Sequence, residues 1–548
     1  MALLIDLFGY LSIILHGVTL VAQSMALGGT LFLLLLTRPF APELREGAEL
    51  ARRTAGIAGW SAIGLVVCEA LTVGMQSAVL QDTLQIPIQG VLGANFAVAG
   101  LVKMAAAAAL ATCLMARRPI GAPPLLALCA VVVLAATLTT HAAARLSGGP
   151  LLLAASALHI LGAAIWIGGI PCFVMAMGHL ENGAAFRRVG ERFSRISMAG
   201  VLCILVSAAV FATLYIGSWK AAYGTAYGVM VGAKAAMFGA LLLLGLGNFL
   251  VVRRLRTDPA TPVLRLRRFA EVEIGIGFTI FFAAASLTSV PPAVDLTHDR
   301  VTWAEILERN TPHVPRLASP DHDLLALPAL QAKLDREAAA QRQAAPQAFT
   351  PGSGELPARN AADIAWSEYN HHWSGLFVAL IGALALLHRA GQGWAKHWPL
   401  AMLGLALFLF LRSDPEVWPL GEIGFFESFR DVEVLQHRVV VILIVAFAVF
   451  EWGVRNGRLR GRPAALVFPL VTALGGALLL THSHAIGNVR DQLLIELAHT
   501  PLALAGVAAG WARWLELRGD GAVRRWAGWV WPICFVIVGA ILLDYREA

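Results

Sequence analysis

The sequence predicts an all-α fold, a polytopic membrane helical bundle of about fourteen transmembrane helices, eight followed by six. Hydrophobic residues make up 58% of the 548 residues and charged residues only 14%, far less charge than a soluble protein of this size carries. The hydrophobic residues gather in runs long enough, or nearly so, to cross a bilayer. Arginines gather in alternate loops between these runs, as they do in multi-pass membrane proteins.

Each predicted helix is one apolar run, and more polar segments separate it from the next. Most runs have roughly the 20 residues that a transmembrane helix needs. The run at 397–411 is shorter, so we expect that helix to be tilted or partly interfacial. The predicted spans are 8–36, 54–79, 93–116, 122–140, 150–178, 196–217, 228–252, 269–290, 372–389, 397–411, 436–453, 464–481, 492–512 and 526–543.

Positive charge orients these helices. Clusters of arginine follow the odd-numbered spans, and the other loops, apart from one long loop, are nearly free of lysine and arginine. By the positive-inside rule the arginine-rich loops face the cytoplasm, and both termini lie outside. The net charge of +7 therefore reflects orientation in a lipid bilayer, and no nucleic-acid partner is predicted. The main clusters are Arg38, Arg45, Arg52 and Arg53; Arg117 and Arg118; Arg187, Arg188, Arg192 and Arg195; Arg253, Arg254, Arg256, Arg265, Arg267 and Arg268; Arg455, Arg458, Arg460 and Arg462; and Arg513, Arg518, Arg524 and Arg525.

The long loop divides the chain into three predicted parts. Residues 296–370 are rich in alanine, proline, glutamine and charge and contain no spanning run, so we expect an outer loop or linker there. It separates an eight-helix membrane domain at 1–295 from a six-helix, histidine-rich membrane domain at 371–548.

The first domain has the pattern of a four-plus-four repeat. His16 in the first span precedes Gly28-Gly29, and His159 in the fifth span precedes Gly168-Gly169. A repeat of four helices keeps both copies in the same orientation, so its symmetry axis would run along the membrane normal.

Histidines carry most of the chemistry that the sequence predicts. Ionisable groups are costly inside a membrane, so those within spans are functional candidates. Seven or eight of the fifteen histidines gather at the predicted outer face, and neutral imidazole binds copper, zinc, iron and haem. The alternative is that histidines at helix ends only form interfacial hydrogen bonds. The candidate metal ligands are His16, His141, His159, His371, His372, His437, His482, His484, Glu496 and His499.

Glu496 and His499 lie three residues apart on one helix face. A Glu-x-x-His pair inside a helical bundle can ligate a metal, but a di-iron site needs a second such pair, and the sequence has none. Glu496 can instead orient His499. Pro501 frees a backbone carbonyl nearby, a local irregularity typical of functional spans.

Two further groups lie inside predicted spans. Glu69 and Lys103 lie about 16 Å and 15 Å from the outer ends of consecutive spans, which predicts an intramembrane ion pair. Such a pair either holds helices together or assists the passage of ions or protons.

Cys172, Met175 and His179 share one helix face near the cytoplasmic end of the fifth span. Sulfur ligands select Cu(I), so these three are candidates for an inner release site, although cysteine and methionine also fill apolar cores.

Several kinds of function lack their motifs. The sequence contains no G-x-x-x-x-G-K-[ST] and no nucleophile–base constellation, so we expect neither an ATP-driven pump nor an enzyme. The six cysteines lie in apolar runs without a C-x-x-C, which argues against a disulfide framework.

Short motifs run through the first 295 residues. They are Thr140-His141-Ala142-Ala143, Leu158-His159-Ile160-Leu161-Gly162-Ala163-Ala164-Ile165-Trp166-Ile167-Gly168-Gly169, Arg192-Phe193-Ser194-Arg195, Tyr227-Gly228 with Lys234 and Asn248, Leu264-Arg265-Leu266-Arg267-Arg268, and Leu287-Thr288-Ser289-Val290-Pro291-Pro292-Ala293. Together they resemble the CopD (PcoD) family of bacterial inner-membrane copper-resistance proteins. The resemblance implies copper handling in the bacterial inner membrane, with copper moving from periplasm to cytoplasm. With the charge pattern above, this places both termini in the periplasm.

The second half looks like the extension of longer CopD-like proteins. The motifs are Ser367-Glu368-Tyr369-Asn370-His371-His372, Arg412-Ser413-Asp414-Pro415-Glu416-Val417-Trp418-Pro419, Thr481-His482-Ser483-His484-Ala485 and His499-Thr500-Pro501-Leu502-Ala503-Leu504. The chain lacks a Met-rich periplasmic segment, so outer capture of copper would rest on histidine.

Three functions stay open at this point. The first is a copper permease, in which the outer histidines of the second half capture the ion and His16, His141, His159 and His499 pass it inward. The second is a membrane cytochrome whose buried histidines ligate haem, which a Soret band would reveal. The third is a partner that delivers copper to a periplasmic copper-binding protein through an outer surface with Trp303, His313 and His322.

Overall fold

The computed structural model describes residues 2–84, 87–140, 148–180, 183–258, 260–297, 300–320, 361–414, 416–430, 432–481 and 489–547. Over these residues the regular structure is helical, apart from one isolated bridge between Val417 and Ile423. Thirteen of the described helices are long and apolar enough to cross a membrane, and the shorter apolar helix Ala122–Leu138 accompanies them. Every predicted span falls on one of these helices, which confirms the all-α polytopic class.

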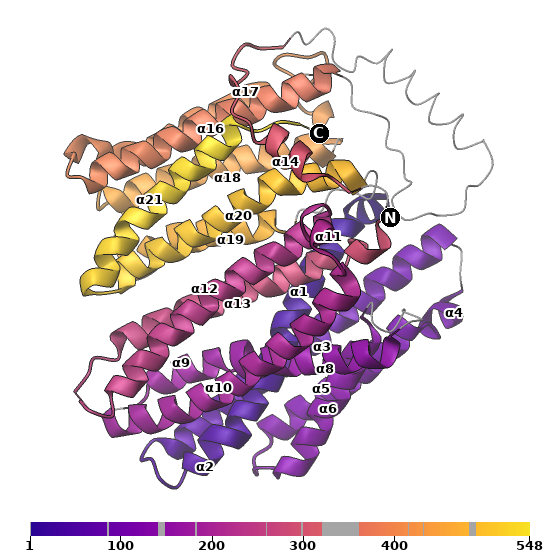
Figure 1. The fold of residues 1–548 in the computed structure, drawn as a ribbon, viewed down its shortest axis with the longest axis vertical. Coiled ribbons are helices and arrows are strands. Elements are labelled where there is room, and N and C mark those ends of the chain that lie inside the picture. The colour runs from indigo at the N-terminus through magenta and orange to yellow at the C-terminus, as the bar shows by residue number, and fades with distance from the viewer. Residues whose placement is uncertain are drawn as a thin grey trace. The chain divides into compact units, whose positions relative to one another are not determined.

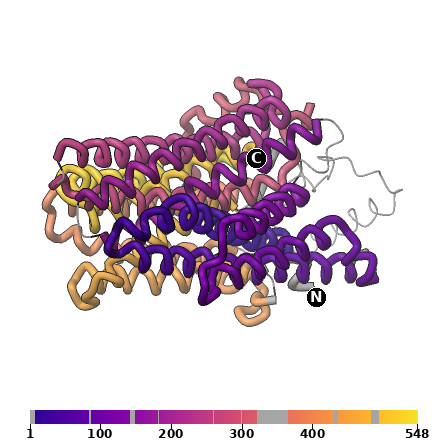
Figure 2. Tube along the Cα trace, turned by 90° about the horizontal axis from the view of Figure 1, so that it is seen from below, coloured from indigo at the N-terminus to yellow at the C-terminus, as the bar shows by residue number. Residues whose placement is uncertain are grey.

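The helices form two compact units, unit 1 mainly from residues 2–295 and unit 2 mainly from residues 296–547. Within each unit the long helices run alongside one another (Figures 1 and 2). These helices expose large apolar side chains, such as Leu134 and Leu243, which are 60% and 72% exposed. A helix that is apolar on nearly every side is stable only when protein or lipid surrounds it, as expected for helices of a membrane protein.

In unit 1 each long helix packs on its neighbour, α1 on α3, α3 on α5 and α5 on α6. The elements are α1 (Ala2–Phe32), η1 (Leu33–Thr37), α2 (Arg38–Phe40), α3 (Gly47–Leu84), α4 (Ile88–Leu92), α5 (Asn95–Met115), α6 (Ala122–Leu138), α8 (Gly149–Ala163), η2 (Ala164–Gly168), α9 (Ile170–Met177), α10 (Gly183–Phe211), η3 (Ala212–Ile216), α11 (Trp219–Tyr223), α12 (Ala226–Arg254), α13 (Leu264–Leu287) and η4 (Ala293–Asp295).

Two glycines let α1 cross the π-helical turn η2 with the backbones in contact. A Cβ atom on Gly28 would lie 2.1 Å from the Ala164 carbonyl oxygen, and one on Gly168 would lie 2.0 Å from the Ser24 carbonyl oxygen. No side chain fits at these distances, so glycine is required at both positions. The two glycine pairs that the sequence places in equivalent spans thus pack against each other. π-Helical turns occur often at functional sites, and η2 also carries Trp166.

Unit 2 also relies on glycines for close packing. Gly375 and Gly382 of α16 face the backbone of α21, and Gly476 of α19 faces α20, where a Cβ would lie 2.6 Å from the Val507 nitrogen. The elements are α14 (Trp303–Arg309), α16 (Ala361–Arg389), η6 (Gly393–Leu400), α17 (Ala401–Arg412), η7 (Glu427–Arg430), α18 (Val432–Arg455), α19 (Arg462–Leu479), α20 (Val489–Arg518) and α21 (Gly521–Leu543). The short predicted span at 397–411 is a 3₁₀ turn, η6, followed by the twelve-residue helix α17.

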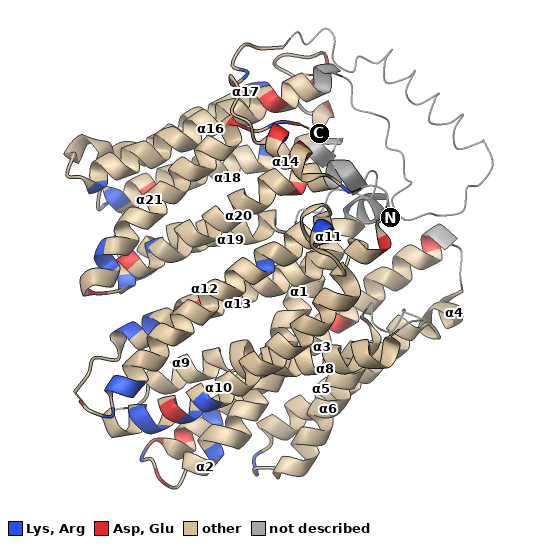
Figure 3. Ribbon diagram, in the orientation of Figure 1, with Lys and Arg blue, Asp and Glu red and all other residues tan. Residues whose placement is uncertain are grey.

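Charge is unevenly distributed along the helices of each unit. Lysine and arginine gather near one set of helix ends, around α9 and α10 in unit 1 and around the ends of α16 and α21 in unit 2 (Figure 3). This is the distribution that the positive-inside rule describes. The arrangement agrees with the sequence-based orientation, while the assignment of either face to the periplasm stays a prediction.

Candidate functional site

Two predicted metal ligands, His371 and His499, meet at one end of unit 2. His371 lies in α16, and His499 lies in α20. Their ring centroids are 6.3 Å apart, and the ring planes are nearly perpendicular. Tyr545, which follows α21, stacks on His371 with centroids 3.9 Å apart and contacts His499 edge-on at 6.0 Å. Three separate segments of the chain therefore build one aromatic and imidazole cluster, called the histidine cluster below.

Backbone hydrogen bonds fix the tautomers of both histidines. The Nδ1 atom of His371 lies 2.8 Å from the Ser367 carbonyl oxygen, and that of His499 lies 3.0 Å from the Ile495 carbonyl oxygen. A carbonyl oxygen only accepts, so each Nδ1 carries the proton and each Nε2 keeps its lone pair. A carbonyl on one ring nitrogen is the usual way in which a protein orients the other nitrogen toward a metal.

His372 has the opposite tautomer. The Arg316 backbone N–H donates to its Nδ1 at 2.7 Å, so Nε2 carries the proton and donates to the Tyr545 carbonyl at 2.9 Å. The side chain is fully buried. Because both ring nitrogens have partners, His372 fastens the segment after α21 to α16 and offers no lone pair to a metal in this arrangement.

Oxygen donors that the sequence analysis did not select surround the cluster. Ser367 and the Tyr545 hydroxyl both donate to Glu547 Oε2, the latter at 2.8 Å. Tyr545 and Glu547 lie beyond the last span, so an inspection of ionisable groups inside spans could not find them. The signal in the sequence is weak: a tyrosine and an acid that follow the last apolar run directly.

The other predicted ligands of the second half have different surroundings. His437 Nδ1 pairs with Asp414 Oδ1 at 2.6 Å, and this carboxylate is 5% exposed. Glu496 Oε2 accepts a hydrogen bond from Thr500 at 3.0 Å. His482 and His484 lie outside the described residues, as His141 does in the first half. Over the part of the chain that is described, no group of three or more His, Cys, Asp or Glu side chains forms a complete metal site.

In unit 1 His159 of α8 bonds to a neighbouring helix. Its Nδ1 lies 2.9 Å from Ser207 Oγ of α10, and its ring meets Phe211 edge-on at 5.5 Å. The Ser207 hydroxyl hydrogen is directed to a carbonyl of its own helix, so the oxygen accepts from His159 Nδ1–H. The lone pair then lies on Nε2, as in His371. His16 is half-buried in α1.

The structure brings Glu69 and Lys103 together. Lys103 Nζ lies 2.9 Å from Glu69 Oε2, and the two side chains are only 5% and 6% exposed. Gly100 makes room for the carboxylate, because a Cβ there would lie 3.3 Å from Glu69 Oε1.

Among the candidates for an inner release site, Cys172 is fully buried, and Nδ1 of His179 donates to the Met175 carbonyl oxygen at 2.8 Å.

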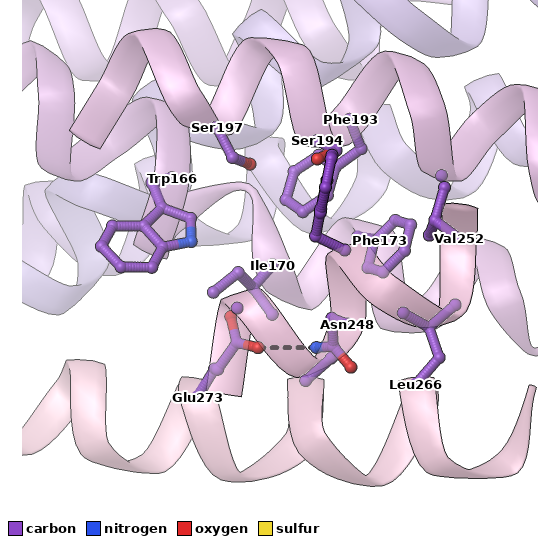
Figure 4. Close-up of a pocket in the computed structure, with 14 residues that line it drawn as sticks. Trp166, Ile170, Phe173, Phe193, Ser194, Ser197, Asn248, Val252, Leu266 and Glu273 are labelled. Atoms are coloured by element: carbon purple, nitrogen blue, oxygen red, sulfur yellow. Dashed lines mark hydrogen bonds between the residues drawn. The ribbon is translucent and has the colours of Figure 1, made fainter. Parts of the chain in front are cut away.

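Unit 1 also contains a cavity of about 60 Å³ beside a carboxylate that the sequence analysis missed (Figure 4). Asn248 Nδ2 of α12 donates to Glu273 Oε1 of α13 at 2.6 Å. Asn248 Oδ1 and Ser197 Oγ are buried and have no hydrogen-bond partner among the described residues. An acid inside the apolar run 269–290 was a signal in itself, but it has no lysine at matching depth to draw attention to it.

These helices define a polytopic membrane protein with buried imidazoles and carboxylates. Residues 187–287 match the family described as Copper resistance protein D (CopD). A stretch of 138 residues is 30% identical to the Copper transport protein CutJ of Bacillus subtilis (strain 168). That match covers 24% of this chain and 24% of CutJ, so the chain spans about a quarter of the length of this curated relative. No solved structure matches the chain.

The CopD match covers α12 and α13 and nearly all of α10. It therefore includes Ser197, Asn248 and Glu273 of the unit 1 cavity. It does not reach the histidine cluster of unit 2, so the description of the second half as the extension of a long CopD form stays a prediction.

Proposed function

We propose that the protein moves copper ions across the bacterial inner membrane, from periplasm to cytoplasm, along a path that histidines line. The observation that carries this proposal is the pair His371 and His499. Two imidazoles from different helices lie 6.3 Å apart, and Nδ1 of each donates to a backbone carbonyl, which leaves Nε2 of each as the nitrogen with the lone pair. Imidazole is a strong ligand for copper, and this fixed tautomer is the ligating one.

The remaining donors near the pair are oxygens. The Tyr545 hydroxyl and the Glu547 carboxylate can add to the two nitrogens. A mixed set of nitrogen and oxygen donors suits Cu(II), whereas Cu(I) prefers sulfur. We therefore assign outer capture to His371 and His499, with His437, His482 and His484 as further outer donors and His16, His141 and His159 as inward steps.

The family match and the name of the relative support copper as the cargo. The proposal keeps the division into an eight-helix domain at 1–295, an outer linker at 296–370 and a six-helix domain at 371–548, with both termini in the periplasm. Without an ATP-binding motif in the sequence, copper would move down its gradient or be coupled to another ion.

Metal analysis of the purified full-length protein tests the proposal. The wild type should bind copper, and the double variant His371→Ala/His499→Ala should lose most of it. His397→Ala is the matched control, because this histidine of unit 2 accepts from Trp452 Nε1 at 2.9 Å and belongs to no proposed path. Electron paramagnetic resonance should show nitrogen ligands to Cu(II) in the wild type and in His397→Ala, and not in the double variant. Unchanged copper content in the double variant would remove the histidine cluster from the path, and a Soret band would favour the cytochrome.

A further inference from the structure

A carboxylate without a cationic partner lies in the wall of the unit 1 cavity. Glu273 is 4% exposed, and its one hydrogen-bond partner among the described residues is the Asn248 amide. None of the ion pairs among the described residues includes Glu273; those of the same helix belong to Glu271. An uncompensated ionised carboxylate in a membrane-spanning helix is strongly disfavoured, so its charge has to be neutralised from outside the chain.

Two further oxygen atoms in the cavity wall lack partners among the described residues. Asn248 Oδ1 and Ser197 Oγ are buried without a hydrogen bond among the described residues, and both side chains are nine-tenths buried or more. They come from α12 and α10 and line the same cavity as Glu273 of α13 (Figure 4). Buried polar atoms are seldom left unsatisfied, so these orphan oxygens indicate a ligand or ordered water.

The size and the walls of the cavity restrict that ligand. A volume of about 60 Å³ is small. At roughly 10–15 Å³ for each water centre, it holds about four water-sized groups. Trp166, Phe173 and Phe193 close its apolar side, so charges inside interact through a low dielectric constant. Carboxylate, amide and hydroxyl oxygens bind hard cations, whereas copper prefers nitrogen and sulfur.

We propose that this cavity binds one sodium ion, with oxygens of Glu273 and Asn248 as direct ligands, and with water completing the shell and linking the ion to the Ser197 hydroxyl. A single carboxylate balances a single positive charge, and a divalent cation would leave excess charge buried. The site does not depend on the copper proposal, because its donors are different and sodium binding can be measured without copper. If copper movement is coupled to an ion gradient, this is the place where the second ion binds.

Radioactive sodium binding to the purified full-length protein tests this site, with choline chloride holding ionic strength constant. The wild type should bind one sodium ion per chain in a saturable way, and Glu273→Gln should abolish binding. Ser197→Ala, which keeps the carboxylate, should weaken binding by up to about tenfold, the effect of losing one polar contact. Glu271→Gln is the matched control, because Glu271 lies on the same helix but pairs with Arg268 at 2.5 Å outside the cavity.

The outcomes separate sodium from a proton. Each variant is first required to elute and melt like the wild type in choline, and Ser197→Ala serves if Glu273→Gln does not fold. Saturable binding that Glu273→Gln or Ser197→Ala weakens, and Glu271→Gln does not, supports the site. Absence of sodium binding to the wild type at neutral and alkaline pH means that a proton neutralises Glu273, and this overturns the proposal. Binding that persists in Glu273→Gln and Ser197→Ala overturns it as well.

Discussion

Glu69 and Glu273 are two carboxylates that unit 1 buries almost equally, at 5% and 4% exposure, but surrounds very differently. Glu69 has a lysine ammonium 2.9 Å away, whereas the partner of Glu273 among the described residues is an amide, at 2.6 Å, beside a small cavity. The first charge is neutralised within the chain and the second is not. Equal burial of the same residue type therefore goes with two different surroundings, an ion pair in one place and a carboxylate beside a cavity in the other.

The largest effect expected from this contrast is on stability. Lys103→Met leaves the Glu69 carboxylate buried without its partner, which should lower the free energy of unfolding by about 3–5 kcal/mol. The double variant Lys103→Met/Glu69→Gln should recover most of this loss, because it removes both charges. Thermal unfolding in detergent measures both. If Lys103→Met alone is as stable as the wild type, another group neutralises the Glu69 carboxylate. Glu69 and Glu273 would then not differ in their dependence on a lysine partner.

The same contrast shows what the sequence could predict about the fold. The membrane spans follow from runs of apolar residues, whose length and period are local properties, so all of them could be placed in advance. The Glu69–Lys103 contact was also within reach, because two antiparallel neighbouring helices bring residues of equal depth side by side. Glu273 was missed because its partner is an amide beside a cavity, and nothing in an apolar sequence identifies empty space.

The roles of adjacent histidines were equally beyond the sequence. His371 and His372 received one predicted role, yet neighbouring residues on an α-helix point about 100° apart. One of them faces His499 and Tyr545, and the other meets the Arg316 backbone, whose position depends on a loop far away in the chain. Long-range contacts of this kind set the tautomer, so only the structure distinguishes a candidate ligand from a structural imidazole.

A smaller effect is expected where Glu273 loses its only hydrogen bond. Asn248→Ala removes the donor to the carboxylate and should lower the free energy of unfolding by about 1–3 kcal/mol in sodium-free buffer. Unfolding midpoints in choline chloride and in sodium chloride give the measurement. The variant should also gain less stability from sodium than the wild type, because it has lost one oxygen ligand. Equal stabilisation of both proteins by sodium would exclude Asn248 from the site.

The smallest effect concerns the hydrogen bond between His159 and Ser207, near a second lysine in the spans of unit 1, Lys234. Lys103 has Glu69 beside it, whereas Lys234 lies within electrostatic reach of His159, whose Nδ1 bonds to Ser207. His159→Ala and Ser207→Ala both remove this interhelical hydrogen bond and should each cost about 0.6–2 kcal/mol of stability. They differ in chemistry, because only His159→Ala removes the Nε2 lone pair. If His159 passes copper, His159→Ala lowers copper accumulation in expressing cells and Ser207→Ala, at matched expression, does not. Normal accumulation in both variants would make His159 a purely structural residue and would remove it from the proposed path.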